Sequence, residues 1–389
     1  MKVKGIHMGI HTIELYAGKL KYPEVQRTID HLVDQRSIQQ IYSDAYSIDR
    51  HLKSTYLVDQ GIRMRLHQSH DKSNGISFAV NPSTLLARAY EPLTLYEPTK
   101  ENVRELQEHL SDVFDEIHLS DHGEAILNPE DLSLSRMDLT ADIRFSKDAD
   151  LSSLIRLFRK SMQPRHYKRC ELEGKENYFF EFATKEISFK VYDKVYELKQ
   201  NDRCPQKYKK QKILRIEVSM KREAFLDKLD LKRKDDLYTM LKAGYDSIGT
   251  VINHFLDKLF PAQAAHLPYP DAERIIQKSK LDSDTKKQML FLLEKTSRSA
   301  GLDTAAQKWK QTYNIVDSRK FNSLMKRFDR LHVNPVTLTS KDKEEIPCVG
   351  TIITRGLNVR CFGRKQSRAV LSGRIRAGLV YRCTAAGES

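Results

Sequence analysis

Several features are scarce in this 389-residue sequence, and each scarcity excludes or disfavours a class of protein. Its five cysteines include no Cys-x-x-Cys pair, which argues against a disulfide framework or a zinc ribbon and favours a reducing cytoplasm. No apolar run approaches the ~20 residues of a spanning helix, so an integral membrane protein is excluded. No Gly-x-x-x-x-Gly-Lys-Ser/Thr loop occurs, so hydrolysis of a nucleoside triphosphate by that route is excluded as well.

What the sequence has in excess is positive charge. Its 66 Lys and Arg residues outnumber 52 Asp and Glu residues, which gives a formal net charge of +14. Much of this excess lies in two segments, 201–222 and 355–389. A basic balance of this size indicates an anionic partner, with nucleic acid the first expectation and an acidic membrane surface the second.

The first 224 residues predict an antiparallel sheet with short helices. Strand-like patterns, mostly of alternating apolar and polar residues, occupy five segments: 62–67, 75–80, 137–145, 186–194 and 213–221. Residues 100–117 instead carry apolar side chains at helical spacing. We therefore expect an α+β protein in which residues 1–224 form the sheet-based domain.

The rest of the chain is expected to be helical at first and weakly structured at the end. An apolar stripe from Leu237 to Leu259 predicts one long helix, and three prolines within 261–270 must end it. Two or three further helices are expected before Leu331. This pattern predicts a helical region at 225–334 and a basic, weakly structured tail at 335–389.

Three of the predicted strands carry a distinctive set of polar side chains. With a period of two, the apolar residues of each strand fall on one face of a sheet and the polar residues on the other. If the three strands are neighbours, the polar face collects Asp138, Asp142, Lys190, Tyr192, Lys194, Arg215 and Glu217. Solvated strand faces without any function alternate in the same way, so the pattern alone leaves both interpretations open.

The chemistry available to such a face is phosphoryl transfer. Grouped carboxylates bind hard divalent cations such as Mg²⁺ or Mn²⁺, and a metal stabilises the charge that develops on a phosphate under attack. Tyr192 becomes a nucleophile when a metal or a cation stabilises its phenolate. Lys194 and Arg215 are the candidates for that stabilisation or for clamping the phosphate.

These segments resemble the motifs of rolling-circle replication initiators, both the gene-II/X type of filamentous phages and the plasmid replication-initiation-factor family. The stretch SRMDLTAD (135–142) is similar to their Arg-hydrophobic-Asp strand, and LRIEVSMK (214–221) to their Arg-hydrophobic-Glu strand. Between them, FKVYDK (189–194) and Glu197 resemble the Tyr-x-Lys-x-x-Glu motif whose tyrosine nicks DNA. The order and the spacing of the motifs agree with those of the family.

The resemblance covers about residues 60–225 and implies an origin-specific, metal-dependent DNA endonuclease and strand-transferase of a phage or plasmid in the cytoplasm of a bacterial host cell. Tyr192 would attack a phosphodiester at the replication origin, become linked to the 5′-phosphate and free a 3′-OH for a polymerase. Asp138 and Glu217 would hold Mg²⁺ or Mn²⁺, with Asp142 as a further candidate ligand.

Ending a round of replication requires a second cleavage. Tyr196 and Tyr178 are candidate second tyrosines, with aromatic packing as the alternative for both, and the second protomer of a homodimer would be another source. None of the 13 histidines forms a His-x-His pair, so the metal site of the two-histidine nickases is not expected.

A basic loop is the first candidate for holding DNA. The segment 204–212 links the predicted tyrosine strand to the glutamate strand, which suits tracking of a single strand next to the site. A solvated hairpin loop is the alternative. The cations of the loop are Lys207, Lys209, Lys210 and Lys212.

A helix-turn-helix pattern at 304–331 is the second candidate. Its second helix would bury an apolar face and present basic side chains to the major groove of duplex DNA. Basic amphipathic helices without any role in DNA binding have the same pattern. The side chains expected on DNA are Arg319, Lys320 and Arg327.

The implied partners are origin DNA in double- and single-stranded form and the host's replication proteins. Because the chain has no phosphate-binding loop of its own, a host helicase is expected, together with a polymerase and a single-strand-binding protein. No membrane partner is expected. Two other functions stay open, a relaxase of a conjugative or integrative element with the same chemistry and a DNA-binding regulator that cuts nothing.

Overall fold

In the computed structural model, most of the chain between residues 2 and 361 is described. The described residues are 2–20, 40–43, 50–68, 74–87, 92–117, 120–121, 124–125, 127–170, 174, 177–298, 301–338 and 345–361. The basic segment beyond residue 361 lies outside them.

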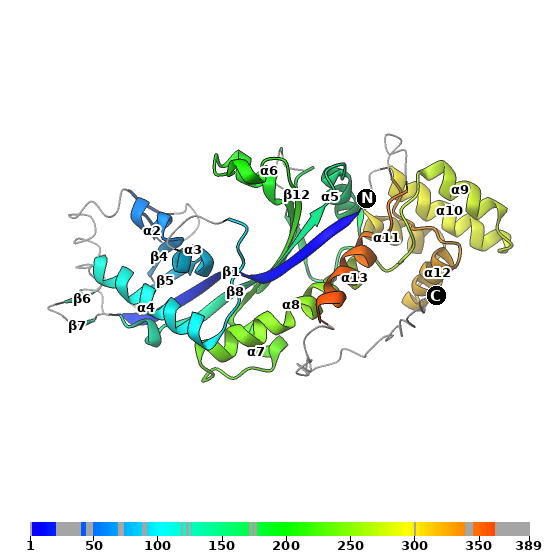
Figure 1. Cartoon of the computed structure of the whole chain (residues 1–389). Coiled ribbons are helices and arrows are strands. Elements are labelled where there is room, and N and C mark those ends of the chain that lie inside the picture. The colour runs from blue at the N-terminus through cyan, green and yellow to red at the C-terminus, as the bar shows by residue number, and fades with distance from the viewer. Residues whose placement is uncertain are drawn as a thin grey trace, which may run out of the picture.

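One antiparallel sheet of ten strands organises the described residues (Figure 1). The order across it is β2-β3-β4-β5-β1-β8-β12-β11-β10-β9. The strands are β1 (Val3–Leu20), β2 (Gln40–Ser43), β3 (Arg50–Lys53), β4 (Ile62–Gln68), β5 (Asn74–Val80), β8 (Ser133–Phe145), β9 (Lys168–Cys170), β10 (Phe179–Ala183), β11 (Ile187–Asp193) and β12 (Lys212–Lys221). A separate short hairpin pairs β6 (Ser120–Asp121) with β7 (Glu124–Ala125). The five predicted strands and the α+β class are confirmed.

The central strand, β1, was not among the predicted strands although it is the longest. It pairs with β8 along most of its length and with β5 along its second half. Ile6, Met8 and Ile10 alternate with polar or small residues, but the register shifts between Ile10 and Thr12, where a β-bulge inserts His11. Because a bulge breaks the period of two, the alternation pattern along this strand is interrupted.

Helices cover the apolar face of the sheet. The long helix α8 (Leu237–Leu259) lies on it so closely that a Cβ at Gly244 would come within 2.5 Å of the Met137 sulfur. α5 (Leu151–Lys160) and α7 (Arg222–Leu229) pack beside α8, and α4 (Lys100–Glu116) covers β5, where Phe114 meets Phe78 with ring centroids 4.8 Å apart. Shorter helices near the opposite face are α2 (Thr55–Asp59), α3 (Pro82–Ala87) and α6 (Lys194–Gln200). In Figure 1, α6 and α8 lie on opposite sides of the sheet.

The C-terminal part is more helical than expected. Four helices, rather than two or three, follow the proline-containing break: α9 (Tyr269–Lys278), α10 (Ser283–Ser297), α11 (Leu302–Thr312) and α12 (Ser318–Arg330). A further helix, α13 (Val349–Cys361), packs against α8 and β1 with Ile353 and Leu357 buried. The described part of the tail is therefore partly helical, contrary to the expectation of weak structure, because its apolar residues complete the core.

The sheet and the C-terminal helices share one continuous hydrophobic core. Because this core continues across residues 224 and 334, it does not mark the predicted domain boundaries. Those boundaries stay predictions. Among the described residues, no helix has the length and apolar character needed to cross a membrane.

Candidate active site

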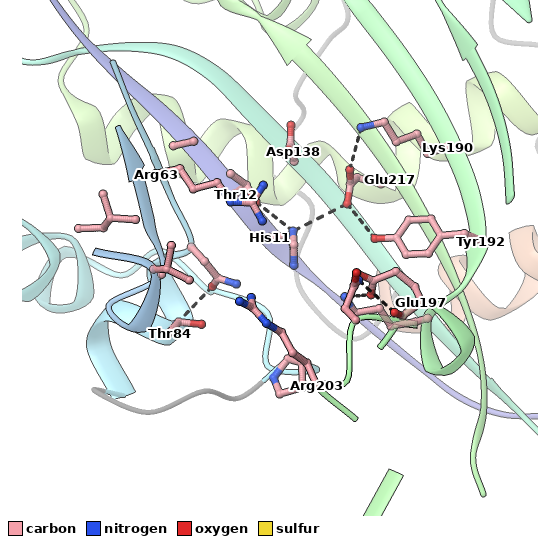
Figure 2. A pocket seen from close by; sticks show the side chains of 18 of the residues that line it. His11, Thr12, Arg63, Thr84, Asp138, Lys190, Tyr192, Glu197, Arg203 and Glu217 are labelled. Carbon is pink, nitrogen blue, oxygen red and sulfur yellow. Dashed lines mark hydrogen bonds and ion pairs between the residues drawn. The ribbon is translucent and has the colours of Figure 1, made fainter. Parts of the chain in front are cut away.

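The polar face of the sheet is hollowed into a cleft of about 580 Å³ (Figure 2). Strands β1, β8, β11 and β12 form its floor, and residues of β4, α3 and α6 form its walls. Five cations and three carboxylates line it, namely Arg63, Arg136, Lys190, Lys194, Arg203, Asp138, Glu197 and Glu217. The cleft therefore has the surplus of positive charge that a phosphate-bearing ligand needs.

Tyr192 and Glu217 meet in this cleft. β11 and β12 pair so that Lys190 lies opposite Glu217, with Tyr192 two residues further along β11. The Tyr192 hydroxyl donates to Glu217 Oε2 at 3.4 Å, and Lys190 Nζ lies 3.5 Å from Glu217 Oε1. Lys190, Tyr192 and Glu217, which the alternation predicts on one face, therefore lie together in the structure.

Tyr192 is held in its protonated form. Burial raises the pKa of its hydroxyl well above the ordinary value of 10, and the Glu217 carboxylate raises it further, while the Arg215 guanidinium opposes both. A protonated phenol is the donor that Glu217 requires, and it is a poor nucleophile. Attack by this oxygen therefore requires a nearby positive charge and an acceptor for its proton.

Asp138 occupies the floor of the cleft on β8. Its Oδ1 accepts a hydrogen bond from Ser219 Oγ at 2.5 Å and lies 3.3 Å from Arg136 Nε. Burial raises the pKa of Asp138 to about 6; Arg136 opposes this rise and the Glu217 carboxylate adds to it. Burial thus makes ionisation of Asp138 costly, and a bound cation would offset that cost.

Asp142 and Arg215 form an ion pair beneath the cleft rather than in it. Arg215 donates from Nε to Asp142 Oδ1 at 2.6 Å and from a terminal nitrogen to Oδ2 at 2.7 Å, and both side chains are buried. The same terminal nitrogen donates to the Pro92 carbonyl at 3.3 Å. Both carboxylate oxygens of Asp142 are thus engaged, and neither residue lines the cleft. This geometry does not favour Asp142 as a metal ligand or Arg215 as a direct phosphate clamp.

Lys194 reaches the cleft from helix α6, although the alternation of apolar and polar residues predicts a strand that includes it. β11 ends at Asp193, whose Oδ1 accepts from the backbone N–H of Tyr196 at 3.0 Å and caps α6. Lys194 Nζ donates to Glu197 Oε2 at 2.8 Å and lies 6.0 Å from the centre of the Tyr192 ring. Burial lowers the pKa of Lys194, and Arg215 lowers it further.

His11 belongs to the site but was missed from the sequence. The bulge in β1 places its Nδ1 3.8 Å from Glu217 Oε2 and 3.0 Å from Thr12 Oγ1 (Figure 2). Burial, followed by the charge of Arg215, lowers the pKa of His11 well below 6.5, so the imidazole is neutral at physiological pH. The alternation that begins at Ile6 is the sequence signal that could have placed His11 on the polar face of a strand. The bulge at His11 interrupts this pattern.

The side chains in the cleft offer the types of ligand atom that a hard divalent cation binds. Asp138 and Glu217 supply carboxylate oxygens, and neutral His11 supplies a nitrogen beside Glu217. Among the residues that the structure describes, no three His, Cys, Asp or Glu side chains are already gathered as a formed ligand set. The residues thus fit Mg²⁺ or Mn²⁺ by type of ligand atom.

The candidate second tyrosines pack against each other outside the cleft lining. The rings of Tyr178 and Tyr196 are stacked, with centroids 3.6 Å apart and planes at 5°. Neither is among the residues that line the cleft around Tyr192. Aromatic packing therefore accounts for both, and their part in a second cleavage stays a prediction.

The basic loop follows Arg203, which lines the cleft, but none of its four lysines lines the cleft itself. Lys207, Lys209 and Lys210 are exposed and Lys212 is half-buried where β12 begins. Lys207 Nζ lies 4.9 Å above the Tyr208 ring, which packs on a small apolar cluster under α6. Contact of these lysines with DNA stays a prediction, and Tyr208 is partly occupied by packing.

The predicted helix-turn-helix pattern at 304–331 falls on two consecutive helices, α11 and α12. Arg319 and Lys320 are exposed at the start of α12, with the Arg319 Nε 2.9 Å from Asp317 Oδ2. Arg327 is different because its guanidinium donates to Thr285 Oγ1 on α10. It ties two helices together, so Arg319 and Lys320 are the better placed of the three for contact with DNA.

An antiparallel sheet that presents a tyrosine among carboxylates and cations defines a candidate site for phosphoryl transfer. The comparison with known families is more specific: residues 97–238 match a phage family described as the N-terminal part of a replication-associated protein of the gene-II type. The matched span includes β8, β11 and β12 with the tyrosine and both carboxylates, and it supports a gene-II-type rolling-circle replication initiator. No curated protein matches the sequence.

Proposed function

We propose that this protein starts rolling-circle replication by cutting one strand of origin DNA with Tyr192. The observation that carries the proposal is the hydrogen bond from the Tyr192 hydroxyl to Glu217 inside a cationic cleft, within the span that matches the replication family. The cut would leave the tyrosine joined to the 5′-phosphate and a free 3′-OH as primer.

The residues divide the chemistry as follows. As the Tyr192 oxygen attacks phosphorus, its proton passes to Glu217 Oε2, the O–P bond to tyrosine forms, and the bond from phosphorus to O3′ breaks. The leaving O3′ takes up a proton from solvent and becomes the 3′-OH. Lys194 in the cleft and Arg215 beneath it stabilise the developing phenolate and phosphate charge.

Asp138 and Glu217 are the residues that would hold Mg²⁺ or Mn²⁺, with His11 as a neutral donor beside them. When bound, such an ion supplies charge stabilisation to the phosphate under attack. Lys190, which lies 3.5 Å from Glu217 Oε1, orients that carboxylate when no ion is present.

The protein would act on origin DNA in the cytoplasm of a bacterial host, with the host's helicase, polymerase and single-strand-binding protein. A homodimer would supply the second nucleophile if neither Tyr178 nor Tyr196 does so. The direct test is to incubate the purified protein with supercoiled origin DNA and Mg²⁺ or Mn²⁺, digest the product, and look for a nucleotide-bearing peptide by mass spectrometry. The proposal predicts the modification on Tyr192, and a cleavage product joined to another residue contradicts it.

A further inference from the structure

Beyond the cleft, the same polar face of the sheet continues over three neighbouring strands, β1, β5 and β4. Their registers align the side chains in rows: Tyr16 lies opposite Ser77, which lies opposite Arg65. The next row contains Gly18, Gly75 and His67. Facing residues of paired strands share a face, so these rows form one continuous surface.

The ring of Tyr16 lies on a floor made of two glycines. A Cβ at Gly18 would come within 2.8 Å of this ring, and a Cβ at Gly75 within 2.6 Å of a ring carbon. His67 meets the edge of the ring with centroids 5.7 Å apart, and its Nε2 is 2.8 Å from Ser77 Oγ. Because Tyr16 is only half-buried, it forms a fixed aromatic platform on the surface of the sheet.

Cations connect this platform to the cleft. Arg63 is exposed and lines the cleft on the side across from Tyr192 (Figure 2), and Arg65 follows it on the same face of β4. Among the described residues, the buried Nε of Arg65 has no hydrogen-bond partner. Glu14 lies in the adjoining row, opposite Ala79, and its carboxylate forms an ion pair with Arg136 at 3.1 Å. The path from the cleft to Tyr16 is therefore positively charged.

We propose that Tyr16 stacks an unpaired base of the DNA strand that leaves the cleft, while Arg63 and Arg65 hold its phosphates. The inference rests on the proposed DNA-cutting function for its choice of ligand. The occupant is single-stranded DNA because an aromatic platform requires an unstacked base, and cations in line beside it require a polyanion. The surface is continuous with the cleft, so one strand can occupy both.

The experiment separates bases from phosphates. The full-length protein carrying Tyr192→Phe, which prevents covalent capture, is titrated with fluorescein-labelled dT20 and with an abasic strand of equal length, across a range of salt concentrations. The protein should bind dT20 more tightly than the abasic strand. Tyr16→Leu should lower dT20 affinity about 5- to 150-fold, with little effect on the abasic strand or on the salt dependence. Tyr16→Phe should retain the preference for bases.

Arg65→Gln should give the complementary result. It should weaken binding of both strands and lower the slope of log affinity against log salt by about 0.7 if one phosphate contact is lost. Tyr238→Leu, on α8 at the opposite face of the sheet, is the matched control and should change neither property.

The proposal is overturned if Tyr16→Leu, folded as judged by its melting temperature, binds both strands as the unsubstituted protein does. Photo-crosslinking of a 5-bromodeoxyuridine strand does not depend on that variant: a crosslinked peptide containing Tyr16 supports the platform, and a map that lacks it contradicts it. Failure of the protein to bind any single strand would also contradict the DNA-cutting function. If single-stranded DNA binds with an affinity that does not depend on Tyr16, this inference alone is overturned.

Discussion

The Tyr192 hydroxyl donates a hydrogen bond of 3.4 Å to Glu217 across the β11–β12 pair. Glu217 also lies next to Lys190 and His11, so one carboxylate connects the proposed nucleophile to a cation and to a neutral imidazole. Because of this placement, the proposed chemistry of the cleft depends on Glu217.

Glu217→Gln should abolish cutting without abolishing DNA binding. The amide keeps the size of the side chain but accepts a proton poorly and is a weak metal ligand, so we expect strand cleavage to fall at least ~10²-fold. Binding of origin DNA, measured by fluorescence anisotropy without metal, should stay within a few-fold. Equal losses of binding and cleavage would show that Glu217 serves mainly the fold.

Two aspartates four residues apart on β8 should respond in opposite ways. Asp142→Ala leaves the buried Arg215 charge without its partner, so we expect a loss of about 3–5 kcal/mol in the free energy of unfolding. Asp138→Asn should instead stabilise the metal-free protein at pH 7 by an amount on the order of 1 kcal/mol, because burial raises the folded-state pKa of Asp138 to about 6.

The sign of the Asp138 effect can be checked with pH. Ionisation of this group costs more in the folded protein than in the unfolded chain, so the penalty is absent below about pH 4 and complete above about pH 6. Chemical denaturation of Asp138→Asn at pH 4 and pH 7 should show the gain only at pH 7. Titration with Mn²⁺ should show weaker binding by Asp138→Asn than by the unsubstituted protein. A gain at both pH values, or unchanged Mn²⁺ affinity, would contradict this assignment.

A buried histidine in the C-terminal part should make the fold sensitive to acid. The Nδ1 of His266 is 2.7 Å from the Val336 carbonyl, and burial lowers its pKa to about 4. Since the unfolded chain binds a proton at about pH 6.5, stability should fall as pH drops from ~6.5 to ~4, by up to about 3 kcal/mol. His266→Gln should remove this slope in urea denaturation, and the exposed His332→Gln should not. Identical slopes for His266→Gln and the unsubstituted protein would be the contrary result.

The start of α12 should contribute duplex binding through charge. Arg319→Gln combined with Lys320→Gln should weaken binding of duplex DNA and reduce the slope of log affinity against log salt by up to about 1.8, if each side chain contacts one phosphate. Arg327→Gln should instead lower the melting temperature, because it removes the hydrogen bond to Thr285. An unchanged salt slope in the double variant would exclude α12 from the DNA interface.

The alternation of apolar and polar residues was sufficient to place Lys190, Tyr192 and Glu217 on one face, because a period of two fixes the face of each side chain whatever covers the sheet. The pattern could not show what covers that face. Leu93 and the apolar side of α6 form a small cluster over part of it, next to Pro92, whose carbonyl accepts from Arg215. Arg215, which the alternation predicts on the polar face, is consequently buried.

The first strand shows a second limit of sequence reasoning. His11 reaches Glu217 because β1 passes through the centre of the sheet and bulges beside it, and both facts depend on pairing with β8 and β5. Local periodicity contains no information on which strands become neighbours. The glycine floor beneath Tyr16 likewise becomes visible only when β1 and β5 are in register.

The central claim is that Tyr192 is the nucleophile, and Tyr192→Phe tests it most directly. This variant loses one oxygen and keeps the ring, so the fold and DNA binding should be retained. With supercoiled origin DNA and Mg²⁺ or Mn²⁺, the unsubstituted protein should produce nicked circles with protein on the 5′ end, and Tyr192→Phe should produce neither. Tyr196→Phe, the matched control four residues away, should still make the first cut. Nicking and a covalent adduct from Tyr192→Phe would contradict the account.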